Sequence, residues 1–114
     1  MITVKPGQSI VLIAQPTPEK TAFYPSAIIT WSNNSELTGQ NIVTTRDELE
    51  NTKCTVTIPS NCTAGRFTVT CTVVNHSNST EFTSTITFMV NGPRPASSVN
   101  IAIQEYVTVT VENN

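Results

Sequence analysis

Charged, aromatic and glycine residues are all scarce in this sequence. Of its 114 residues, 12% are charged, 6% are aromatic and four are glycine, and the formal net charge is -2. Such a chain has no strong electrostatic field that would attract a phosphate backbone or an anionic lipid surface. We therefore expect no nucleic acid and no membrane among its partners.

Groups that carry chemistry are scarce as well. Asp47 is the only aspartate and His76 the only histidine, and the sequence contains no metal-ligand spacing, phosphate-binding loop or nucleophile motif. We therefore expect a protein that is not an enzyme and that uses no cofactor or metal. The acidic stretch of Asp47, Glu48 and Glu50 could offer oxygens to calcium, but it lacks the regular spacing of a calcium loop, and we interpret it as a solvated turn.

Leader segments and disulfide patterns are also missing. The chain begins without a basic leader or an apolar signal segment, so we expect a protein made in the cytoplasm or already trimmed. Cys54 and Cys62 lie at opposite ends of one expected strand, about 25 Å apart at about 3.4 Å per residue, whereas a disulfide needs roughly 6 Å between α-carbons. With Cys71 packed inward as a small apolar residue, we predict three free thiols and synthesis in a reducing compartment.

Alternation of apolar residues with threonine is the strongest pattern in the chain. It runs over residues 65–74 and again over residues 81–90, which predicts a hairpin of two long antiparallel strands. In the first of these strands the inward positions are Phe67, Val69, Cys71 and Val73.

Shorter segments of strand composition precede this hairpin, and proline, glycine and asparagine turns separate them. With the hairpin they make seven expected strands at spacings of about ten residues, a rhythm that favours an all-β fold with two packed sheets. The expected strands are residues 2–4, 9–14, 27–32, 41–45, 53–58, 65–74 and 81–90.

Two of the shorter strands have distinctive faces. Residues 9–14 are almost wholly apolar, as expected for a strand of a sheet that lies sandwiched beneath another. Ile29 and Trp31 share one face of the strand over residues 27–32. We interpret Trp31, the only tryptophan, as part of the core rather than as a ligand platform.

The chain continues beyond the seventh strand. Residues 93–98 have the composition of a stiff, proline-rich linker. Residues 99–114 then alternate again, either as one strand of about 44 Å or as a hairpin folded near Gln104 and Glu105. We consider this stretch a candidate anchoring arm that crosses to a neighbour, or else an eighth strand of its own domain. The apolar and aromatic residues of the arm are Val99, Ile101, Ile103, Tyr106, Val107, Val109 and Val111.

Four asparagines begin an Asn-x-Ser/Thr triplet, the acceptor signal for glycans in eukaryotic secreted proteins. Because serine and threonine are abundant in this chain, such triplets arise by chance, and we treat the signal as weak. The four are Asn33, Asn61, Asn75 and Asn78.

Three segments, in their order and spacing, resemble the immunoglobulin-like domains of bacterial surface proteins and tailed-phage structural proteins. They are residues 6–12, 29–32 and 64–70, and the similarity covers residues 2–90. It implies an immunoglobulin-like two-sheet β-sandwich over residues 1–92, acting as a binding or display module without a defined ligand.

Two departures separate the chain from antibody-type domains. Residues 10–13 hold no cysteine that could bridge to Cys71, and Val69 stands where those domains have a tyrosine. These differences favour the bacterial and phage group. The family topology would also bring Phe23 and Tyr24 to the same end of the domain as the tip that holds His76. There the aromatic pair forms either an exposed contact site for a partner or a cap on the core.

The resemblance implies a non-enzymatic structural protein, a capsid decoration or head-fibre protein displayed on the virion surface after synthesis in the host cytoplasm. Its expected partners are capsid proteins or sister subunits in a homo-oligomer, with a host surface glycan as a further candidate. The first alternative is a module of a bacterial adhesin at the cell surface, serving as a spacer or as a binder of glycans or host cells. The second is a glycosylated viral or eukaryotic surface domain.

Overall fold

The computed structural model describes residues 1–35, 41–75 and 80–102, and each strand in these ranges overlaps one predicted from the sequence. His76 and residues 103–114 lie outside the described residues. The strands are β1 (Ile2–Val4), β2 (Ser9–Ile13), β3 (Ile28–Asn33), β4 (Val43–Arg46), β5 (Lys53–Thr57), β6 (Gly65–Asn75) and β7 (Thr80–Val90).

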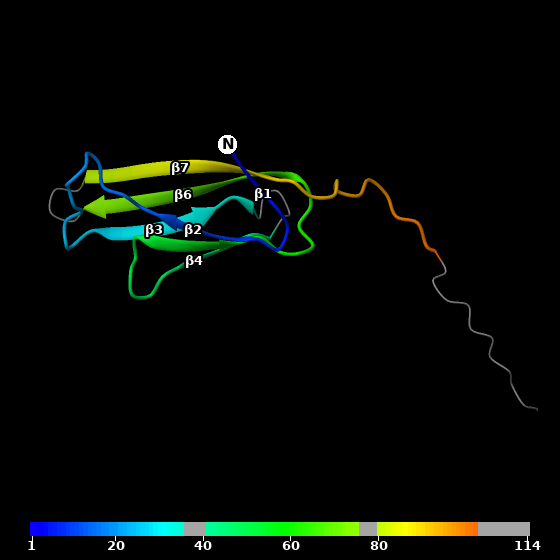
Figure 1. Ribbon diagram of the computed structural model, residues 1–114, viewed down its shortest axis with the longest axis horizontal. Helices are drawn as coiled ribbons and strands as arrows, with labels where there is room; N and C mark the ends of the chain where they lie inside the picture. Colours follow the sequence, from blue (N-terminus) through cyan, green and yellow to red (C-terminus); the bar gives the residue numbers. More distant parts are fainter. Residues whose placement is uncertain (36–40, 76–79, 103–114) are drawn as a thin grey trace, which may run out of the picture.

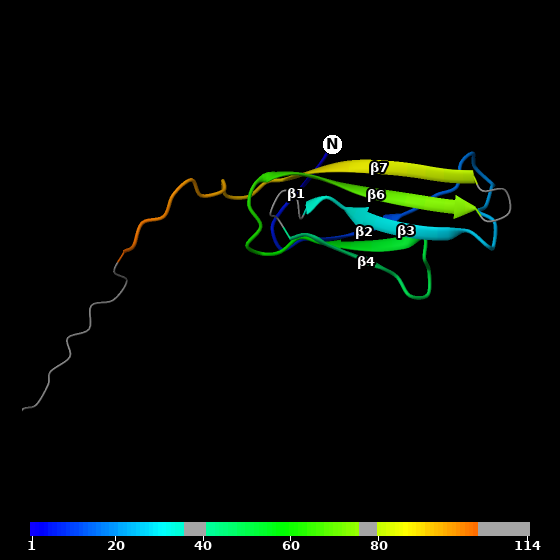
Figure 2. The same ribbon diagram turned by 180° about the vertical axis from the view of Figure 1, so that it is seen from behind.

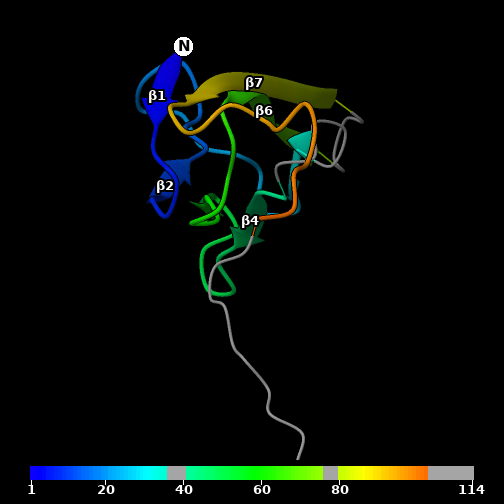
Figure 3. The same cartoon turned by 90° about the vertical axis from the view of Figure 1, so that its right-hand side faces the viewer.

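The strands form two sheets that face each other. One sheet has the order β1-β7-β6-β3 and the other the order β2-β5-β4. Figure 1 shows the two layers from the side, and Figure 2 shows them from behind. In the end-on view of Figure 3, β7 and β6 lie above β2 and β4, with β1 at the margin. The predicted all-β fold of two packed sheets is confirmed, with the layers arranged as in a β-sandwich.

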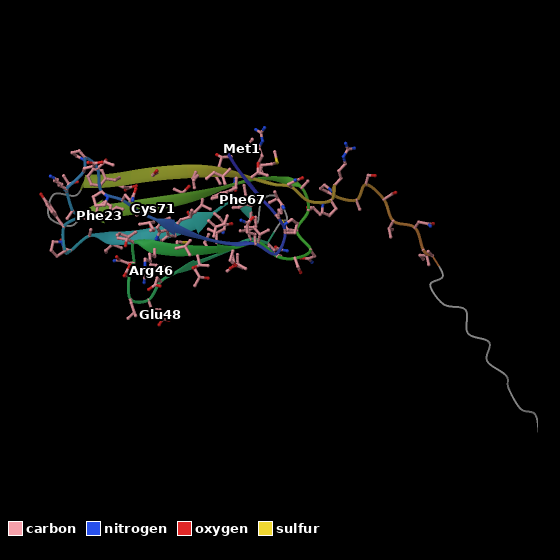
Figure 4. The ribbon with its side chains drawn as sticks, in the orientation of Figure 1. Met1, Phe23, Arg46, Glu48, Phe67 and Cys71 are labelled. Atoms are coloured by element: carbon pink, nitrogen blue, oxygen red, sulfur yellow. The ribbon has the colours of Figure 1, made fainter. Side chains whose placement is uncertain are left out.

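The β6–β7 hairpin organises the four-stranded sheet. Its two strands pair in antiparallel register from Gly65 opposite Val90 to Asn75 opposite Thr80. The side chains of β6 that were predicted to face inward, from Phe67 to Val73 at every second position, are all buried. In Figure 4, Phe23, Cys71 and Phe67 follow one another between the layers, from the loop end toward the end where the chain leaves the domain.

Two apolar clusters fill the space between the sheets. The larger one is centred on Phe67 and Phe88, which lie opposite each other in the hairpin and stack with ring centroids 5.0 Å apart at an interplanar angle of 11°. The smaller one consists of Ile29, Cys71 and Val73 at the loop end. Trp31 is partly buried against both clusters, and its Nε1 donates to the Asn51 carbonyl at 3.1 Å, so it contributes to the core.

Strand β2 is covered on one face only. Its inward residues Ile10 and Leu12 pack against the core, but Val11 and Ile13 are 59% and 57% exposed. They point to the outer face of the three-stranded sheet, where the described residues supply no third layer. An apolar residue on an outward position is common on protein surfaces and does not by itself indicate a buried strand.

Candidate functional site

The two long sides of the domain, where the edges of the sheets meet, are closed to different degrees. On the side of β3 and β4, polar side chains join the layers. Asn33 Nδ2 donates to the Ile42 carbonyl at 3.1 Å and to Thr44 Oγ1 at 3.3 Å, and Arg46 Nη1 donates to the Ile29 carbonyl at 3.4 Å. On the side of β2 and β7, within the described ranges, no hydrogen bond joins the two strands.

The side between β2 and β7 is open along the part of β7 that has no partner other than β6 among the described residues. β1 pairs with β7 in parallel, but only from Ile2 opposite Phe88 to Val4 opposite Val90. Residues 81–87 of β7 are therefore paired on one side only, with β6, as far as the described residues show. This stretch is a free strand edge, which presents unpaired backbone donors and acceptors to solvent.

A groove of about 590 Å³ lies along this open side. We call it the β2–β7 groove. Its walls come from the end of β2, from the loop that follows it and from the unpaired part of β7, and its floor is made by core residues of β3 and β6. The residues that matter most for its shape are Leu12, Ile13, Phe23, Trp31, Phe82 and Ile86.

The inward positions of β7 become progressively exposed along the groove. Phe88 and Val90 are fully buried at one end, Ile86 is partly buried, and Phe82 at the other end is 52% exposed although it occupies an inward position. The two layers are packed together around Phe88 and lie open around Phe82. The groove therefore exposes apolar side chains that face the space between the sheets. Exposed apolar surface of this kind is typical of a binding site.

The loop between β2 and β3 forms one end of the groove and carries two predicted site residues. Phe23 is partly buried against the cluster of Ile29, Cys71 and Val73, whereas Tyr24 is 46% exposed. Both line the groove. The sequence left open whether this pair caps the core or forms an exposed contact site. In the structure Phe23 covers the end of the core, whereas Tyr24 offers an exposed ring.

The described lining of the groove consists of apolar and uncharged polar side chains. Its lining includes no Asp, Glu, His, Lys or Arg among the described residues. Burial raises the pKa of the Cys71 thiol, which disfavours the reactive thiolate. In the same described part of the chain, no group of three potential metal ligands converges. The site can take up apolar side chains and pair with an extended backbone.

The acidic turn has a structural role. The Asp47 carboxylate accepts hydrogen bonds from the backbone N–H groups of Leu49 and Glu50, each at 2.9 Å. Those bonds, with the one from Glu50 contributing most, hold the pKa of Asp47 below its ordinary value. Glu50 in turn pairs with Lys53 at 3.2 Å. The carboxylates thus stabilise the connection between β4 and β5, as expected for a solvated turn.

One glycan candidate also has a structural role. Beyond its contacts with β4, the Asn33 side chain accepts hydrogen bonds from Ser35 N at 2.9 Å and Ser35 Oγ at 2.6 Å. Its amide nitrogen already bonds Ile42 and Thr44, so a glycan on Asn33 would break contacts between the layers. Asn61 is exposed, and Asn78 lies outside the described residues.

The candidate arm is only partly described. After Pro93, whose carbonyl accepts a hydrogen bond from Ala64 N at 2.7 Å, the chain runs exposed through residues 94–102. Val99 and Ile101 are 91% and 94% exposed. The other predicted arm residues, Ile103, Tyr106, Val107, Val109 and Val111, lie outside the described residues, as does His76.

Sequence reasoning missed the groove. The alternation over residues 81–90 does place Phe82 on the inward face, and this was the one available signal. Whether an inward residue is covered depends on which strand lies beside it, and that follows from the short pairing of β1 with β7. A short first strand next to a long seventh one would have been the clue.

In the described residues the fold and this site together define a small all-β domain with two facing sheets, an open apolar groove and an exposed segment over residues 94–102. Comparisons of the chain with protein-family models, with curated proteins and with solved structures found no match. In residues 1–35, 41–75 and 80–102, no helix has the length and apolarity required to cross a membrane.

Proposed function

We propose that this chain is a non-enzymatic structural and binding module of immunoglobulin-like topology, displayed on a phage particle as a capsid decoration or head-fibre protein. The strand order supports the topology. In immunoglobulin-like domains the third, sixth and seventh strands share one sheet, and the second, fifth and fourth share the other. Strands β2 to β7 of this chain have the same partition, whereas β1 pairs with β7 instead of joining the sheet of β2.

The observation that carries the proposal is the separation of two contact regions at opposite ends of the domain. The loop with Phe23 and Tyr24 lies at one end, and the chain leaves the packed domain at the other (Figures 1 and 4). Beyond Pro93 the described residues have no packing role and include the exposed apolar residues Val99 and Ile101. A module anchored by this stretch would present its aromatic loop away from the surface that holds it.

The proposal predicts where the protein is found. Immunogold labelling of purified particles from the native source, with an antibody against residues 1–92, should place the protein on the outside of the shell. Deletion of residues 97–114 should release it from particles, because the anchor is lost. The matched control Tyr24→Ala, which changes the opposite end, should remain attached.

Two results would contradict the proposal. If the protein is absent from particles and labels bacterial envelopes, the adhesin alternative is favoured. If particles retain the protein lacking residues 97–114 as well as they retain the full chain, the arm is not the anchor.

A further inference from the structure

The β2–β7 groove lacks the one element that would complete it, an additional strand beside β7. Residues 81–87 offer a free backbone edge, and the inward positions Phe82, Ser84 and Ile86 leave apolar surface uncovered beside that edge. An extended segment that paired with this edge would satisfy backbone groups and cover apolar surface in a single step. This is the mode of recognition called β-strand addition.

The sequence contains a segment that fits this requirement. Residues 106–112 read Tyr-Val-Thr-Val-Thr-Val-Glu, without proline or glycine, and five of the seven are β-branched. Such residues favour an extended strand that packs on a half-buried surface. In an extended strand Val107, Val109 and Val111 would share one face and Thr108 and Thr110 the other, the same period of two by which Phe82, Ser84 and Ile86 alternate with Thr83 and Thr85 in β7.

The direction in which the chain leaves the domain favours a neighbouring copy as the source of this segment. Residues 94–102 extend away from the domain at the end opposite the loop that closes the groove (Figure 1). Val99 and Ile101 make no packing contact that would hold them against their own domain, as their exposure shows. The 13 residue-to-residue steps from Pro93 to Tyr106 can span up to about 44 Å, which is enough to reach an adjacent molecule.

We propose that the β2–β7 groove is the acceptor site for residues 106–112 of a second copy of this chain, which pairs as an additional strand with residues 81–87 of β7. The inference rests on the anchoring role of the arm proposed above and names the surface that receives it. Two copies can exchange arms reciprocally and form a closed dimer, or each can bind the next in an open series. Either arrangement covers Phe82 and the free edge of β7.

Three full-length variants test the proposal by light scattering during size-exclusion chromatography over a range of concentrations. The wild-type chain should associate. Phe82→Lys places an ammonium group in the groove and Val109→Lys places one on the arm. Each should weaken association by about tenfold or more, because a buried unpaired charge is costly. The matched control Ser32→Lys carries the same charge on an exposed outward position of β3, away from the groove and from β7, and should associate like the wild type.

Mixing the two defective variants gives the sharpest result. Phe82→Lys copies keep an intact arm and Val109→Lys copies keep an intact groove, so the mixture should form one-to-one complexes that neither variant forms alone. A wild-type chain that is monomeric at all concentrations would overturn the proposal, since the arm would then stay with its own domain or with another partner. Association that survives both substitutions, or a mixture that stays monomeric, would also overturn it.

A substitute variant and the use of purified protein make the result of the test unambiguous. If Phe82→Lys is unfolded by circular dichroism, Ser84→Lys replaces it, because Ser84 is exposed in the same groove and its loss removes no apolar packing. All measurements use the purified protein alone. A negative result in these association measurements would therefore not change the result of the immunogold labelling. The proposed exchange of arms and the proposed display on a particle can fail separately.

Discussion

The two phenylalanines of β7 allow a direct measurement of how far the core is closed. Phe82 and Phe88 have the same inward orientation in the same strand, but Phe88 is fully buried and stacked on Phe67, whereas Phe82 is 52% exposed in the groove. Replacing each by alanine removes the same atoms from two different environments. The difference between the two losses of stability therefore measures how much more completely Phe88 is enclosed than Phe82.

The burial of each ring determines how much free energy of unfolding the substitution should cost. Phe88→Ala removes an enclosed ring, leaves a cavity and abolishes the stacking with Phe67, so it should lower the free energy of unfolding by about 3–5 kcal/mol. Full burial of a large apolar side chain is worth about 1.5–3 kcal/mol, and Phe82 realises roughly half of it. Phe82→Ala should therefore cost about 1 kcal/mol, because the open groove leaves no enclosed cavity.

Urea unfolding followed by the fluorescence of Trp31 is the suitable assay, because this single tryptophan packs against both clusters. The measurement is made at concentrations at which the wild-type chain is monomeric. Phe88→Leu, which keeps most of the apolar volume, should lie between the wild type and Phe88→Ala. Equal losses at positions 82 and 88 would refute the reasoning, since they would mean that Phe82 is enclosed and the groove is not open.

Four other predictions follow from buried or hydrogen-bonded groups. Ser35→Ala should cost about 1–3 kcal/mol in urea unfolding, because Ser35 is buried and its Oγ is the acceptor for Ile42 N at 2.9 Å, a donor that would lose this partner. The thiols of Cys54, Cys62 and Cys71 should react much faster with a thiol reagent after unfolding than before it, because each side chain is buried in the folded chain and burial raises the pKa of each thiol. For the same reason the stability should be constant below the ordinary thiol pKa of 9.0 and decline above it, since the unfolded chain then loses protons that the folded chain retains. Asp47→Ala should lower the stability at neutral pH, and its deficit should shrink as the pH falls through the depressed pKa of Asp47, because protonation weakens the same hydrogen bonds in the wild type. A deficit that is independent of pH would assign the loss to packing instead.

The strands were predictable because their signals are local. The alternation over residues 65–74 and 81–90 and the turns around Pro6 and Pro59 depend only on neighbouring residues, and the observed elements follow them closely. The inward residues of β6 follow from the same period of two, because successive side chains of a strand point to opposite faces.

The remaining features depend on contacts between distant parts of the chain. The apolar run of β2 does not reveal whether a third layer covers Val11 and Ile13, and in the described residues none does. Asn33 begins a glycan triplet in the sequence, but its role depends on Ile42 and Thr44 in the facing sheet. The groove, likewise, lies beside a part of β7 that β1 does not pair with, and the register of Ile2–Val4 on Phe88–Val90 is not encoded by any local pattern.

The parallel pairing of β1 with β7 has a mechanical consequence. Tension between Met1 and the C-terminal arm pulls the two strands in opposite directions along their common axis. The hydrogen bonds between Ile2–Val4 and Phe88–Val90, together with the bond from Asn91 N to the Val4 carbonyl at 2.8 Å, then carry the load in shear and at the same time. An antiparallel pair loaded at one end would open bond by bond, whereas this short strand resists as a unit.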